Sequence, residues 1–113
     1  MPAPTGDHPP LPADTLQDAA AIFGMLAATA RTHIIWLLAD GEKDVGTLAA
    51  EIGQTVATTS QHLAKLKLAG LVGARRNGRH QHYFVDNPHL VDIVERAVAS
   101  QSATPVKRRR SAV

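Results

Sequence analysis

Residues 55–85 read TVATTSQHLAKLKLAGLVGARRNGRHQHYFV, and this stretch decides the fold that we expect. Its first part has the polar face and apolar spacing of a short helix, and Gly70 suits the left-handed residue that ends one. The remainder predicts strands at about 71–75 and 81–85, because Asn77-Gly78 is a strong signal for a tight hairpin turn. The segment therefore predicts a helix followed by a hairpin, or wing.

Further helices are predicted on both sides of this segment. Apolar residues recur at helical spacing after Asp14 or Thr15, at about 29–39, at about 45–52 and after Pro88. Only Gly-Gln-Thr separates the third helix from the fourth, and a short Gly-containing turn is typical of a helix-turn-helix. We therefore expect a mainly α (α+β) winged helix-turn-helix with the element order ααααββα.

Length and composition indicate one small domain. The 113 residues include five prolines within residues 1–14, so we expect a disordered arm at 1–14, the domain at 15–102 and a disordered basic tail at 103–113. A core of this size gains from self-association, which favours a homodimer. The absence of Cys excludes disulfides and thiolate metal sites. No membrane span or secretion signal is indicated, so we expect a cytoplasmic protein.

The charges are unevenly placed along the chain. The formal net charge is only +2, yet residues 52–85 contain five Lys or Arg and no Asp or Glu. A stretch of a small domain whose charged residues are all positive is typical of a surface that binds a polyanion such as nucleic acid.

In a helix-turn-helix, the second helix presents its N-terminal residues to base edges in the major groove. We expect Val56, Leu63 and Leu66 to pack inward, which leaves polar residues near or on the outer face. Gln61 has the amide that pairs with adenine N6 and N7, and wing cations suit phosphates. The candidate DNA contacts are Thr58, Thr59, Ser60, Gln61, His62, Lys65 and Lys67 in the helix, and Arg75, Arg76 and Arg79 in the wing.

Four segments resemble the ArsR/SmtB winged-helix regulators of bacteria: LAATARTHIIWLL (26–38), DVGTLAAEIG (44–53), TSQHLAKLKLAGLV (59–72) and RRNGRHQHY (75–83). The resemblance covers about residues 14–100, and the nickel-responsive members are the most similar. It implies a homodimer joined through the first and last helices, inverted-repeat operator DNA, and a response to a metal or another inducer. The implied dimer interface contains Leu16, Ala19 and Phe23 of the first helix, and Leu90, Ile93, Val94 and Ala97 of the last.

The metal patterns of this family are incomplete in this sequence. Of the last-helix pattern D-x-H-x10-H-x2-[HE], His89 matches the first His, but Asn87 stands in the Asp position with Asp86 beside it. The distal positions fall on Ser100 and Ala103, neither of which is a metal ligand. The remaining candidates for nickel or zinc are His89 with Asp86 or Asp92, and the wing pair His80 and His82.

The sequence therefore predicts a dimeric, sequence-specific regulator of transcription that binds operator DNA, under nickel-dependent control either directly or through a separate sensor protein. The alternative is a winged helix used only for contacts with proteins. No paired carboxylates in an apolar setting, phosphate-binding Gly loop or HExxH motif is present, so we do not expect an enzyme.

Overall fold

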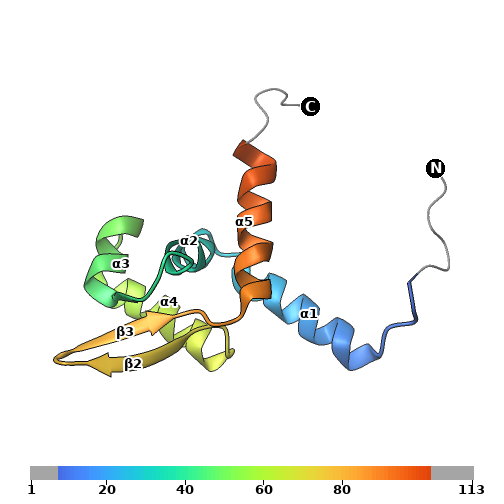
Figure 1. Ribbon diagram of the computed structural model, residues 1–113, viewed down its shortest axis with the longest axis horizontal. Coiled ribbons are helices and arrows are strands. Elements are labelled where there is room, and N and C mark those ends of the chain that lie inside the picture. Colours follow the sequence, from blue (N-terminus) through green and yellow to red (C-terminus); the bar gives the residue numbers. More distant parts are fainter. Residues whose placement is uncertain (1–7, 103–113) are drawn as a thin grey trace.

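The computed structural model describes residues 8–102 as five helices and a small antiparallel sheet (Figure 1). The elements in chain order are α1 (Ala13–Leu26), α2 (Thr29–Leu38), β1 (Lys43–Asp44), α3 (Val45–Ile52), α4 (Val56–Leu68), β2 (Gly73–Asn77), β3 (His80–Phe84) and α5 (Pro88–Ser102). The predicted winged helix-turn-helix is confirmed. The strands lie within about two residues of their expected bounds.

The sheet contains one strand that the sequence did not predict. β1 is only two residues long and pairs with β3, with Lys43 opposite Tyr83 and Asp44 opposite His82. β3 also pairs with β2, so the strand order is β1-β3-β2. A two-residue strand has no periodic pattern of its own, and it exists here because β3 supplies its hydrogen-bonding partner.

α3 begins and ends at residues that suit those positions, whereas α1 starts earlier than expected. The Asp44 side chain accepts a 2.8 Å hydrogen bond from the Thr47 backbone N–H and so caps α3. Gly53 has a φ of 73° and ends α3 in the left-handed conformation that favours glycine. α1 starts at Ala13, two or three residues before the start that Asp14 or Thr15 as N-cap would give, and has no side-chain cap.

The core is centred on α2, which lies between the helix-turn-helix and α5 (Figure 1). Ile34 and Ile35 are fully buried, and residues from α3, α4, α5 and the chain before β2 surround them. The buried cluster consists of Ile34, Ile35, Leu38, Leu48, Leu63, Leu66, Val72, Leu90 and Val94. This packing fixes α4 and the wing relative to α2.

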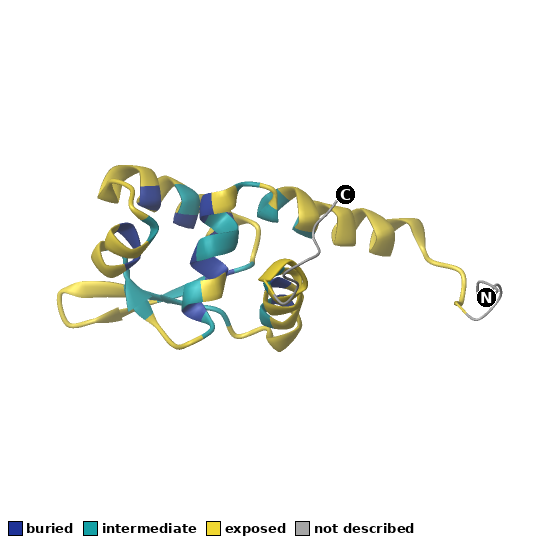
Figure 2. Cartoon of the chain, turned by 90° about the horizontal axis from the view of Figure 1, so that it is seen from above, coloured by how far each residue is buried: buried dark blue, intermediate teal, exposed yellow. Residues whose placement is uncertain are grey.

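Within the described chain, α1 buries none of its residues and extends away from the core (Figures 1 and 2). Its apolar side chains Leu16 and Phe23 are 57% and 62% exposed. Across residues 8–102, no single helix is long and apolar enough to span a membrane; α1 and α2 pass that test only as a pair bent by 97°.

The expected domain boundaries fall at the edges of what is described. α5 continues to Ser102, and residues 8–12 precede α1 without helix or strand. Residues 1–7 of the predicted arm and the whole predicted tail, 103–113, lie outside the described residues.

Candidate nucleic-acid interface

α4 begins at a hydroxyl cap. The Thr55 hydroxyl accepts a 3.0 Å hydrogen bond from the Thr58 backbone N–H, and the two hydroxyl oxygens are also 3.0 Å apart. The cap occupies one of the free N–H groups at the helix start. At the other end, Gly70 has a φ of 78°, and the Leu71 N–H donates to the Leu66 carbonyl. These two ends define a helix that is separated from α3 by the short turn of a helix-turn-helix.

The buried stripe of α4 differs from our expectation at two positions. Leu63 and Leu66 are fully buried as predicted, but Thr59 is also 0% exposed and Val56 is 51% exposed. The Thr59 hydroxyl donates a 2.7 Å hydrogen bond to the Thr55 carbonyl, which satisfies its polar group inside the core. The prediction of Thr59 on the outer face was therefore wrong. Thr59 is a packing residue in this structure and is not available to a base.

The other polar residues predicted on α4 reach solvent. Thr58, Ser60, Gln61, Lys65 and Lys67 are exposed. They are the solvent-accessible polar residues that α4 contributes to the candidate interface.

His62 is only half-buried. Burial is the largest effect on its pKa, which is lowered, and the nearby positive charges of Arg31 and Lys65 lower the pKa further. His62 therefore tends to be neutral, which favours a hydrogen-bonding role over a charge contact with phosphate.

The wing is the hairpin of β2, a tight turn and β3, residues 73–84. Gly78 in the turn has a φ of 67°, a conformation that glycine adopts without strain. Arg75 lies opposite His82, and Arg76 lies opposite Gln81. Since successive residues of a strand point to opposite faces, these two arginines are on different faces of the sheet.

Arg75 is held by contacts within the protein. Its Nε atom is 2.8 Å from Glu42 Oε2, and its guanidinium carbon lies 4.3 Å from the centroid of the Phe84 ring. The ring covers Gly73, because a Cβ atom at position 73 would lie only 2.4 Å from Phe84 Cζ. Among the described acids, by contrast, none pairs with Arg76 or Arg79. Within the part of the chain that the structure describes, Arg76 and Arg79 are thus the wing arginines without an acidic partner.

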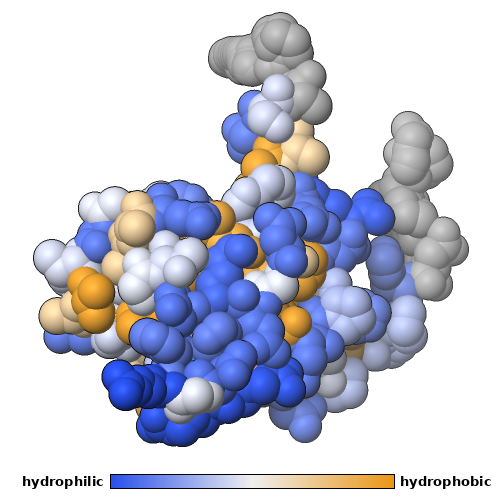
Figure 3. Space-filling model, turned by 60° about the vertical axis from the view of Figure 1, so that its left-hand side comes forward, coloured by the Kyte–Doolittle hydropathy of each residue, from blue (hydrophilic) through white to orange (hydrophobic). Residues whose placement is uncertain are grey.

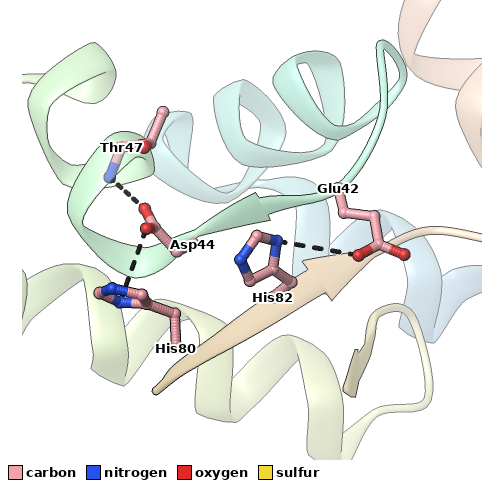
Figure 4. Close-up of polar contacts among 5 residues, drawn as sticks. All are labelled: Glu42, Asp44, Thr47, His80 and His82. Carbon is pink, nitrogen blue, oxygen red and sulfur yellow. Dashed lines mark hydrogen bonds and ion pairs between the residues drawn. The ribbon is translucent and has the colours of Figure 1, made fainter. Parts of the chain in front are cut away.

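The wing histidines also face carboxylates (Figure 4). His80 Nδ1 lies 3.9 Å from Asp44 Oδ2, and His82 Nδ1 lies 3.8 Å from Glu42 Oε1. The Asp44 pKa is lowered, mainly by the hydrogen bond from the Thr47 backbone N–H and then by the Thr47 side chain. Glu42 and Asp44, which lie at β1, therefore place negative charge beside the wing, although residues 52–85 contain no Asp or Glu. These two carboxylates offset part of the positive charge of the wing.

The side of the molecule where the wing and α3 lie is mostly hydrophilic (Figure 3). It comes forward in that view, and apolar residues form only separate spots on it. A polar, solvated face of this kind is typical of surfaces that bind nucleic acid.

The metal candidates do not form a complete site. Within residues 8–102, no group of three or more His, Asp or Glu side chains is placed to hold a metal ion. His89 and Asp86 are exposed, and the His89 backbone N–H donates to the Asn87 side chain at 2.9 Å. Of the distal family positions, Ala103 lies outside the described residues, and Ser100 donates its hydroxyl to the Ala97 carbonyl.

The residues predicted for a dimer interface divide into two groups. Leu16, Ala19, Phe23, Ile93 and Ala97 are exposed. Leu90 and Val94 are each 2% exposed and belong to the core cluster. Their assignment to the interface was wrong, because α5 turns that stripe toward α2 within one chain.

Residues 28–73 match the model of the arsR family of bacterial regulatory proteins. Over 89 residues, the chain is 42% identical to the HTH-type transcriptional regulator KmtR of Mycobacterium tuberculosis, covering 79% of this chain and 68% of KmtR. The chain belongs to the arsR family. Members of this family are transcriptional regulators, which confirms the expectation that the protein is not an enzyme.

Two further proteins are similar to this arsR-family chain. It is 34% identical over 85 residues to a cadmium resistance transcriptional regulatory protein, a CadC homolog of Staphylococcus aureus, covering 74% of this chain and 70% of that one. The solution structure of Mb0332 from Mycobacterium bovis, described as a homodimeric winged helix-turn-helix DNA-binding domain, superposes with a TM-score of 0.72. That match has 29% identity and covers 94% of this chain and all of Mb0332.

Proposed function

We propose that this arsR-family regulator binds an inverted-repeat operator in duplex DNA as a homodimer. The observation that carries the proposal is the exposure of polar residues on the outer face of α4 and of the wing cations Arg76 and Arg79, which have no acidic partner among the described residues. An α-helix with exposed amide and hydroxyl groups fits the major groove, and a basic hairpin beside it fits the backbone or the adjacent minor groove.

The uncovered face of α1 supports a homodimer. Leu16 and Phe23 are more than half exposed, and exposed apolar side chains in series mark a surface that meets a partner. Ile93 and Ala97 on α5 are exposed as well, so both terminal helices offer apolar area to a second copy. Mb0332 is homodimeric and has the same fold, which adds support. Two-fold symmetry of the protein then implies two-fold symmetry of the operator.

We propose in addition that metal, nickel in the first instance or zinc, controls this binding. The cadmium resistance relative supports a connection with metals. The described residues do not fit a complete metal site, and His89 with Asp86 would supply only two ligands. Control can therefore act through ligands contributed by a second copy or through a separate sensor protein.

A fluorescence anisotropy titration tests the proposal. The labelled duplexes are a palindromic sequence from the promoter region of the gene and a random sequence of equal length. Gln61 is exposed on α4, so Gln61→Ala should lose about 1–3 kcal/mol on the palindrome and little on random duplex. Equal losses on both would mean that Gln61 does not read bases.

The same titration also tests whether the protein binds only other proteins and whether it senses metal directly. A protein that ignores both duplexes at low salt would be a protein-contact module instead. Nickel or zinc added to the purified dimer, with and without cell extract, separates direct control from control through a sensor. Release by metal alone indicates direct binding, and release only with extract indicates a sensor.

A further inference from the structure

The burial pattern of α4 identifies which residues point most directly outward. The buried stripe is Thr59, Leu63 and Leu66, and each helix residue advances by about 100° around the axis. The stripe opposite to it consists of Ala57, Gln61, Ala64 and Leu68. All four of these residues are exposed, and Leu68 is 91% exposed. This outward stripe is therefore one amide between two alanines, followed by a leucine.

The side chains around Gln61 have a specific chemical character. Ala57 is one turn before it and Ala64 one turn after it, so a methyl group flanks the amide on each side. Short side chains allow the helix backbone to come close to the floor of the groove. In the major groove, adenine offers N7 and N6 to an amide, and the 5-methyl of thymine is the apolar group that a methyl side chain contacts.

We propose that α4 reads a core of A·T base pairs, in which Gln61 pairs with adenine and Ala57 and Ala64 contact the 5-methyl groups of thymines on either side. The seven helical steps from Ala57 to Ala64 span about 10 Å, which is about three base-pair steps. The core of each half-site is thus about four base pairs long. This inference rests on the proposed function and names the class of sequence that the regulator selects.

The experiment begins with sequence selection from a random duplex library by the wild-type protein. Each thymine of the selected half-site is then replaced singly by deoxyuridine, which removes only the 5-methyl group. We expect two positions at which the Kd rises about fourfold, the value of one buried methyl-sized group. Replacing the central adenine by 7-deazaadenine should weaken wild-type binding but not the binding of Gln61→Ala.

Variants of the outward stripe connect each effect to a residue. In Ala57→Gly and Ala64→Gly, the penalty for deoxyuridine should disappear, each at a different thymine. The deoxyuridine penalty is compared between wild type and variant, so a loss of helix stability that weakens binding to both duplexes equally cancels. Leu68→Ala is the matched control, because it removes apolar surface from the same stripe but one turn beyond the proposed core. It should keep both deoxyuridine penalties.

The outcomes separate the inference from the function on which it rests. If no sequence is enriched, the proposed function itself fails. If a sequence is enriched but its core is G·C, or every deoxyuridine substitution is neutral, the operator is real and this reading of α4 is overturned. Enrichment of A·T through the minor groove would also leave deoxyuridine neutral, because the 5-methyl lies in the major groove.

Discussion

The two arginines at the start of the wing should contribute differently to DNA binding. Arg75 is ion-paired with Glu42 at 2.8 Å and stacked over Phe84, whereas Arg76 on the opposite face has no acidic partner among the described residues. We therefore predict that Arg76→Gln reduces the salt dependence of operator binding and that Arg75→Gln does not.

The expected magnitude follows from counterion release. Each neutralised phosphate contributes about 0.9 to the slope of log affinity against log salt, so two wings of a dimer contribute about 1.8 through Arg76. Between about 50 and about 200 mM KCl, wild-type affinity should fall about tenfold further than that of Arg76→Gln. The Arg75–Glu42 ion pair is exposed to solvent, so its loss should lower the free energy of unfolding by ~1 kcal/mol or less at every salt concentration.

Anisotropy titrations over a KCl series measure these slopes directly. Arg96→Gln is the matched control, because it also removes one positive charge but lies on α5, paired with Asp92 at 2.9 Å. Its slope should equal that of the wild type. An equal reduction in slope for Arg75→Gln and Arg76→Gln would refute the reasoning, because it would show that Arg75 leaves Glu42 to bind phosphate.

Three further predictions concern stability and metal. Gly73→Ala should lower the free energy of unfolding by about 1–3 kcal/mol in urea titrations, because its Cβ would collide with Phe84, whereas Gly46→Ala, with its nearest neighbouring atom at an ordinary 3.8 Å, should not destabilise. The Asp44 pKa is lowered in the folded state by the backbone N–H at the start of α3, so its contribution to stability is present above the unfolded pKa of about 3.9 and is lost as pH falls through the folded pKa. Urea titrations between about pH 6 and pH 2 should show this loss in the wild type and a smaller one in Asp44→Asn; equal losses would contradict the assignment. His89→Ala should leave metal-dependent release of DNA unchanged, since its site is incomplete, and abolition of release would show that a second chain completes it.

Local signals in the sequence determined the elements and their order. The glycines at 53 and 70, which have positive φ, and the Asn-Gly turn act over a few residues, so the helices and the hairpin could be predicted directly. The accessible polar residues of α4, Gln61 among them, followed from the same helical periodicity.

The faces of α4 and α5 were predicted less well than their lengths. Thr59 was expected outside because it is polar, but its hydroxyl bonds to the carbonyl one turn earlier, and this lets it pack like an apolar residue. Leu90 and Val94 were expected to meet a second chain, and they meet α2 instead. An apolar stripe shows that a face is buried but not which neighbour buries it.

Sequence alone therefore determined a winged helix with a basic, acid-free segment, because propensity, capping and turn chemistry act between near neighbours along the chain. Only the tertiary structure decided the charge environment of that segment. Glu42 reaches Arg75 because β1 and β2 both pair with β3 in one small sheet, and Coulomb attraction depends on distance in space rather than on separation in sequence.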